Sequence, residues 1–173
     1  MSDIVFTHFS HEEMVEGIHA VAAAMESDHW RPSLLVGVGR GGLAPGVYLS
    51  HRLDLPLVSI DHSARIAQFG EELVAVLAAR TRAGDRLLFV EDINDSGRTI
   101  GEIRGALAAQ GADAANIRFA VLLDNIRSAE RVDYRFREID RDVTKDWFIF
   151  PWEAMAPSEK QIEDAMEVPE RIA

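Results

Sequence analysis

Four short apolar runs, none of which alternates with polar residues, constrain the fold of this chain more than any other feature. They occupy residues 34–38, 57–60, 87–90 and 117–123. A strand that is apolar on both faces is typical of a parallel sheet covered on both sides by helices. Stretches of helical composition separate the runs. The chain therefore predicts an α/β protein with a doubly wound, mostly parallel sheet flanked by helices.

The helices expected between these runs carry their own start and stop signals. Ser10 and Glu13 fit a capping box, in which the Ser10 hydroxyl accepts from a first-turn amide and Glu13 reaches back to the cap. Apolar residues then recur at helical spacing. A second helical stretch covers residues 43–53. A third covers residues 99–110 and stops at Gly111, a residue type that commonly ends helices.

Other segments are less regular. Residues 61–71 are polar and predict a loop, whereas residues 72–77 fit either a short strand or a helix. Residues 125–146 are rich in Arg and Asp, and residues 147–152 are densely aromatic. The tail, residues 157–173, is acidic and polar. The Arg/Asp-rich segment and its aromatic end predict a small subdomain laid over the sheet.

Length predicts a single domain spanning residues 1–173. Its core is expected at about residues 30–124. A small C-terminal hood is expected at about residues 125–156, joined by the N-terminal segment. The hydrophobic fraction of 47% is enough to supply a core and argues against disorder.

Charge and cysteine content narrow the function classes. The net charge of −11 argues against a nucleic-acid binder, because phosphate contacts need a basic face, but it leaves room for a local anion pocket. The absence of Cys excludes disulfides, thiolate nucleophiles and Cys-ligated zinc, and fits a reducing cytoplasm. No apolar stretch is long enough to span a bilayer, and the N-terminus lacks the pattern of a signal peptide. We expect a soluble, cytoplasmic protein.

The most informative motif follows the third apolar run. Glu91 and Asp92 come at the carboxyl end of that run, where open α/β sheets bind ligands. A loop of small and hydroxyl residues then leads into a helix N-terminus, which is a ready anion site. Carboxylates beside a phosphate cradle suit a sugar phosphate. An ordinary strand–helix turn, or a magnesium site in a phosphoacceptor domain of flavodoxin-like topology, would also fit these residues.

A second motif follows the first apolar run. Arg40 offers a forked cation, and Gly41 and Gly42 expose backbone amides to an anion. A glycine pair after a strand is often only a tight turn. The aromatic segment at residues 147–152, taken alone, is more often core or an interface anchor.

These motifs together resemble type I phosphoribosyltransferases, and most closely the bacterial and archaeal xanthine-guanine enzymes. Residues 91–99, Glu-Asp-Ile-Asn-Asp-Ser-Gly-Arg-Thr, are similar to the family's phosphoribosyl pyrophosphate (PRPP) signature, except at Asn94, which is usually apolar. Residues 38–46 resemble the pyrophosphate loop. Residues 146–153 resemble the C-terminal segment that places an aromatic ring on the base. The resemblance runs from about residue 34 to residue 153.

The resemblance implies where the donor binds. Glu91 and Asp92 would bind the ribose hydroxyls and are candidate ligands of the Mg²⁺ that accompanies PRPP. Pyrophosphate would lie against Gly39, Arg40 and Gly41. The 5-phosphate would lie against the amides and hydroxyls of Asp95, Ser96, Gly97, Arg98 and Thr99.

The resemblance also implies how the base is bound. Asp95 would take a proton from the imidazole ring of a purine, Trp147 would stack on the base, and Phe148 would line its edge. One departure concerns the base. A lysine that donates to the purine 6-oxygen in the 6-oxopurine enzymes is replaced here by Asp124 and Asn125. The Asn125 amide could donate instead, and Arg127 is close in sequence.

The expected function is transfer of 5-phosphoribosyl from PRPP to a purine base, a 6-oxopurine, giving a nucleoside monophosphate and pyrophosphate in purine salvage. A non-catalytic phosphoribosyl or nucleotide sensor on the same fold is the alternative. The expected partners are small molecules and a second copy of the chain in a homodimer or homotetramer, with no nucleic acid and no membrane.

Two further expectations concern mobile or exposed residues. The loop at residues 62–71 would close over the reacting centre, with His62 as a candidate ligand contact. Five arginines alternate with acids, which usually indicates a solvated face. They are Arg127, Arg131, Arg135, Arg137 and Arg141.

Overall fold

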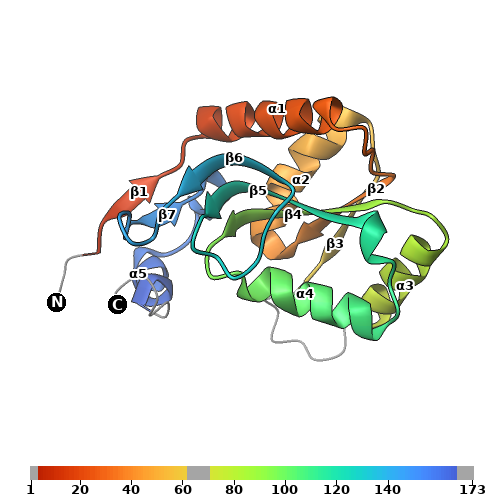
Figure 1. Cartoon of the computed structure of the whole chain (residues 1–173). Helices are drawn as coiled ribbons and strands as arrows, with labels where there is room; N and C mark the ends of the chain where they lie inside the picture. The colour runs from red at the N-terminus through yellow and green to blue at the C-terminus, as the bar shows by residue number, and fades with distance from the viewer. Residues whose placement is uncertain (1–3, 62–70, 167–173) are drawn as a thin grey trace.

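The computed structural model describes residues 4–61 and 71–166 and contains a five-stranded parallel sheet (Figure 1). The strands lie in the order β3-β2-β4-β5-β6, and every neighbouring pair is parallel. This confirms the α/β fold class. The strands are β2 (Leu34–Val38), β3 (Leu57–Ile60), β4 (Leu87–Asn94), β5 (Ile117–Asn125) and β6 (Tyr134–Ile139).

Helices cover both faces of this sheet (Figure 1). The helices α1 (His11–Ser27) and α2 (Gly39–Leu53) pack on one face, where Leu35 and Leu88 belong to their core cluster. The helices α3 (Glu71–Arg82) and α4 (Arg98–Ala109) pack on the other, where Val36 and Phe89 belong to theirs. Alternate residues of one strand therefore enter opposite cores, which explains why the strands are apolar on both faces.

The structure decides one segment that the sequence left open and moves two predicted boundaries. Residues 72–77, which fitted either state, are helical within α3 because Leu77 and Ala78 face the sheet. The helix after the first strand begins at Gly39 and not at residue 43. The strand β4 continues past residue 90, so Glu91 and Asp92 lie on the strand and not after it.

A smaller unit stands at the carboxyl ends of the strands. The N-terminal strand β1 (Phe6–His8) pairs in parallel with β7 (Trp147–Ile149). A 3-10 turn, η2 (Pro151–Glu153), and the helix α5 (Ser158–Met166) follow. The expected hood over residues 125–156 is thus divided. Its first part, β6, joins the main sheet beside β5, because Tyr134 and Ile139 are buried there.

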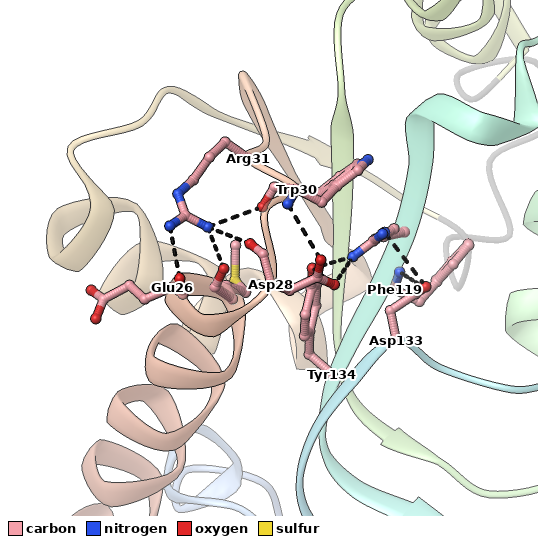
Figure 2. A network of polar contacts seen from close by, with 9 residues as sticks. Glu26, Asp28, Trp30, Arg31, Phe119, Asp133 and Tyr134 are labelled. Atoms are coloured by element: carbon pink, nitrogen blue, oxygen red, sulfur yellow. Dashed lines mark hydrogen bonds and ion pairs between the residues drawn. The ribbon is translucent and has the colours of Figure 1, made fainter.

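The amino ends of the strands carry a separate polar network, on the side opposite to the hood (Figure 2). Asp28, at the end of α1, accepts from Arg118 and from the Tyr134 hydroxyl. The Arg118 guanidinium lies 4.7 Å from the Trp30 ring centroid. Arg31 donates to backbone carbonyls in the last turn of α1, including that of Glu26 at 2.9 Å. These contacts fix α1 against the sheet and leave the other end of the sheet for a site.

Within the described residues, no helix has the length and apolar character that crossing a membrane requires.

Candidate active site

A cavity of about 770 Å³ lies between the carboxyl ends of β2 and β4 and the hood. The register places Gly37 of β2 beside Val90 of β4, so the segments that follow the two strands are neighbours. The cavity brings together twelve of the thirteen residues expected to bind substrate. They are Gly39, Arg40, Gly41, Glu91, Asp92, Asp95, Ser96, Gly97, Arg98 and Thr99, joined by Trp147 and Phe148 of the expected base site.

The remaining expected residue, Asn125, does not line the cavity. Its side chain instead makes hydrogen bonds with the backbone of three neighbouring residues. Its Nδ2 donates to the backbone oxygen of Asp95 at 2.9 Å, and its Oδ1 accepts from the backbone amides of Arg127 and Arg141. Asn125 therefore holds the loop that carries Asp95, and its side chain does not reach the cavity.

The expected pyrophosphate loop is the first turn of α2. Its cap residue, Val38, offers no side chain to the free amides, which leaves them available to an anion. The glycines are also needed for close packing. A Cβ on Gly41 would lie 2.3 Å from Asp92 Oδ2, and one on Gly42 would lie 1.9 Å from the Val90 carbonyl oxygen. This contact brings the loop directly against the end of β4.

The expected 5-phosphate loop also leads into the first turn of a helix, in this case α4. Gly97 is the cap residue of α4 and has a φ of 88°, so it offers no side chain to the helix amides. Ser96 Oγ accepts from the Arg98 amide at 3.3 Å, so the first amide of this helix is shared with a hydroxyl of the same loop. A Cβ at Gly97 would lie 2.7 Å from the Glu130 amide nitrogen and from Ser128 Oγ. Two helix N-termini thus open on one cavity, which suits a ligand with two phosphoryl groups.

Three of the carboxyl groups that line the cavity have raised pKa values. Burial and the charge of Asp92 hold the pKa of Glu91 well above its ordinary value. Burial and the charge of Glu153 raise the pKa of Asp92 to about 7. Burial raises the pKa of Glu153 as well, and the charge of Arg40 opposes that rise. The wall therefore favours ligands that bring positive charge or hydrogen-bond donors.

The carboxylates fit a Mg²⁺ ion that arrives with a phosphorylated substrate. Within the described residues, no group of three or more His, Asp or Glu side chains forms a metal site. Mg²⁺ is commonly held by one or two carboxylates together with substrate phosphates, and Glu91 and Asp92 supply two adjacent carboxylates.

Arg141 is the main correction to the sequence analysis. It was grouped with arginines of a solvated face, yet its side chain is only 6% exposed and lines the cavity. Its Nε and Nη2 donate to Asp95 Oδ1 and Oδ2, each at 2.8 Å. Its guanidinium lies 5.3 Å from the centre of the Phe148 ring, which helps to cover it. Asp95 is therefore held by a two-point ion pair that the sequence pattern did not indicate.

Asn94, the departure from the family signature, has a structural explanation. It is 2% exposed, and its Nδ2 donates to Asp124 Oδ1 at 2.8 Å and to the Glu130 carbonyl at 2.9 Å. Ser128 Oγ donates to Asn94 Oδ1 at 2.8 Å. The unusual amide and the unusual acid at residue 124 are therefore partners in one buried network.

The aromatic wall is larger than expected. Trp147 and Phe148 of β7 line the cavity, and so do Phe150 and Trp152, whose rings stack at 4.9 Å with an interplanar angle of 5°. Other lining residues were not singled out in the sequence, because their positions depend on how the hood folds back. They are Glu153, Lys160, Gln161 and Asp164. Residues 62–70, with His62, lie outside the described residues.

Comparison with known proteins identifies the family. A model of the phosphoribosyl transferase domain matches residues 9–158 of this chain. The chain belongs to this family. The resemblance that the motifs carried is thereby confirmed, and phosphoribosyltransferases are enzymes of the pentosyltransferase class.

Relatives and solved structures agree with this membership. The chain is 27% identical over 128 residues to a xanthine-guanine phosphoribosyltransferase of Cereibacter sphaeroides, covering 72% of this chain and 70% of that protein. A purine phosphoribosyltransferase of Pyrococcus horikoshii is 24% identical, with a TM-score of 0.62 over 88% of this chain and 97% of that one. A Neisseria gonorrhoeae protein solved with bound ppGpp is 17% identical, with a TM-score of 0.68 over 96% and 99%. The two structures show that the fold is shared.

Proposed function

We propose that this phosphoribosyltransferase transfers 5-phosphoribosyl from PRPP to a 6-oxopurine base and releases pyrophosphate. The observation that carries the proposal is the meeting of the N-termini of α2 and α4 on one cavity, with an acidic pair between them. Two anion-binding helix ends on either side of an acidic pair match a pentose that bears a phosphate at one end and a pyrophosphate at the other. The Cereibacter relative is named for xanthine and guanine, which are both 6-oxopurines.

The donor would lie across the ends of β2 and β4. The 5-phosphate would take the amides at the start of α4, and pyrophosphate those at the start of α2, beside Arg40. Glu91 and Asp92 would accept from the ribose hydroxyls. Mg²⁺, when bound with PRPP, would offset the negative charge of the leaving pyrophosphate.

The reaction breaks the bond between C1 of the ribose and the pyrophosphate oxygen and forms a bond from C1 to a ring nitrogen of the base. Positive charge builds on the ribose ring, and the nearby carboxylates of Glu91 and Asp92 would stabilise it. Asp95 would accept the proton that leaves the imidazole ring of the base. Trp147 and Phe148 would hold the base by ring contact, and the hood would limit access of water.

The experiment is direct. Purified protein with PRPP and Mg²⁺ is offered hypoxanthine, guanine, xanthine and adenine in turn, and release of pyrophosphate is measured. Turnover of at least one of the three 6-oxopurines is expected, with adenine the poorest acceptor. Absence of pyrophosphate with all four bases would overturn the proposed activity.

A second candidate is a nucleotide-binding regulator without turnover. It is favoured by the acid and amide at residues 124 and 125 in place of a cation, and the Neisseria structure holds ppGpp on the same fold. This candidate predicts that guanine nucleotides raise the melting temperature although no base in the panel is consumed. Turnover at an ordinary enzymatic rate would reject it.

A further inference from the structure

Arg141 is held in one orientation by contacts on three sides. Two of its nitrogens bind the Asp95 carboxylate, and Nη1 donates to the backbone oxygens of Thr144 at 3.2 Å and Asp146 at 2.8 Å. The backbone amide of Arg141 donates to Asn125 Oδ1 at 3.3 Å. A guanidinium fixed in this way has a defined direction for every N–H group.

One donor of this guanidinium is not used by these contacts. Nη2 carries two N–H groups and donates one bond, to Asp95 Oδ2. Among the described residues, no second acceptor is bonded to Nη2. The side chain lines the cavity although it is 6% exposed. A buried cation with a spare donor therefore lies beside the Asp95 carboxylate in the cavity wall.

From this geometry we propose that Arg141 and Asp95 together recognise the edge of a purine that carries the 6-oxygen. The inference rests on the proposed function and deepens it. On that edge a ring N–H at position 7 lies next to the oxygen at position 6. Asp95 would accept from the ring nitrogen, and the spare N–H of Arg141 Nη2 would donate to the oxygen. An amino group at position 6 would meet a donor with a donor, so adenine is disfavoured.

The other cations that line the cavity are less suited to this role. Arg40 lies at the start of α2, where the proposed function places pyrophosphate. Arg98 is 82% exposed and pairs with Glu102, and Lys160 is drawn to two acids of its own helix. Asp124 and Asn125 are occupied in buried hydrogen bonds. Arg141 thus takes over the function of the absent lysine from a different part of the chain.

The test compares two acceptors that differ in the oxygen at position 6 and in the proton on N1 that accompanies it. Hypoxanthine carries the oxygen, and unsubstituted purine lacks it. The ratio of kcat/KM for the two bases is measured in the wild type, in Arg141→Met and in Arg141→Lys. The matched control is Arg127→Met, which removes an arginine that pairs with Asp140 and does not line the cavity. Because both bases are assayed on one preparation, the ratio does not depend on the fraction of folded protein.

The wild type is expected to prefer hypoxanthine by at least about tenfold, as a hydrogen bond to a charged group allows. Arg141→Met should lose most of that preference, and Arg127→Met should keep it. A lysine at residue 141 cannot both hold Asp95 and donate to the base with the geometry of arginine. The hypoxanthine preference of Arg141→Lys should therefore fall between those of the wild type and Arg141→Met. Arg141→Lys serves as the test if the methionine variant does not fold. If the activity of Arg141→Met falls equally for both bases, Arg141 only positions Asp95 and the inference is wrong.

A binding measurement separates this inference from the proposed function. Calorimetry with inosine monophosphate and with purine riboside 5′-monophosphate needs no turnover. The wild type could show no turnover and still bind the 6-oxo nucleotide more tightly, with this preference lost in Arg141→Met. That result would contradict the proposed function and leave the inference standing. A wild type that binds both nucleotides equally, or neither, overturns the inference.

Discussion

Asp92, a buried carboxyl group in the cavity wall, lowers the stability of the folded protein at neutral pH. Its pKa is raised to about 7 by burial and by the charge of Glu153, so the folded state holds a proton that the unfolded chain releases near its ordinary value. Stability from this group is therefore present at low pH and is lost as pH rises toward 7. Above that range, the folded protein carries an unfavourable charge at Asp92.

The first prediction follows from that sign. Asp92→Asn should raise the free energy of unfolding relative to the wild type, and the gap should be about 2 kcal/mol larger at pH 8.5 than at pH 5. Urea denaturation at the two pH values measures it. Asp140→Asn is the control, because Arg127 lowers the pKa of that partly exposed carboxyl. A gap that narrows with rising pH would contradict the electrostatics described for the cavity.

A second prediction concerns Asp95. Replacement by Asn keeps an acceptor for Arg141 but removes the negative charge that takes the proton. Turnover should fall by about 10²–10⁴-fold, as expected for loss of a general base. Pyrophosphate release gives the rate, and thermal melting shows whether the fold persists. Wild-type turnover in Asp95→Asn would remove its role as the base.

The buried network around Asn94 gives a third prediction. Asn94→Leu restores an apolar residue at the position but leaves the Asp124 carboxyl and the Ser128 hydroxyl without their amide partner. The expected loss is on the order of 1–3 kcal/mol in the free energy of unfolding. A neutral or stabilising effect, measured by denaturation, would show that the network is not needed for stability. Asn116→Ala, which removes an amide bond to the Thr81 carbonyl nearer the surface, is the comparison.

At the scale of elements, the contact between the start of α2 and the end of β4 gives a fourth prediction. Gly42→Ala would place a methyl group 1.9 Å from the Val90 carbonyl oxygen, so the helix must shift. Destabilisation by about 1–3 kcal/mol is expected, together with weaker binding of PRPP. Gly105→Ala is the control. It lies in α4, is exposed and has no neighbour within 4 Å of its Cβ, so it should stabilise by about 0.5–1 kcal/mol.

Equal effects of the two alanine substitutions on the free energy of unfolding would contradict the packing role of Gly42. The pair separates a glycine that a close approach requires from one that a helix merely tolerates.

The elements differ in how far sequence could predict them. The strand at residues 34–38 was predicted with its observed bounds, because its apolar run and its length are local properties. The start of α2 was not, since it depends on how closely its glycines approach β4. Arg141 looked like its neighbours in the alternating series, and only the fold of the 140–146 loop buries it. The acidic pair and the two glycine loops were predictable because their chemistry is local and their strands end at the same edge.

At the scale of the whole molecule, the site joins parts that are distant in sequence. The hood unites β1 from the N-terminus with β7 from near the C-terminus, and it covers the carboxyl ends of the main sheet (Figure 1). The opposite end is fixed by the Asp28, Arg118 and Tyr134 contacts (Figure 2). The contacts at one end of the sheet thus fix α1, and the other end carries the candidate active site.

The most direct measurement is a crystal structure of the protein with PRPP and Mg²⁺. The 5-phosphate should lie against the amides at residues 96–99, the pyrophosphate against residues 39–41, and the ribose over Glu91 and Asp92. A donor bound elsewhere, or one that reaches only one of the two loops, would contradict the central claim that both loops serve a single phosphoribosyl site.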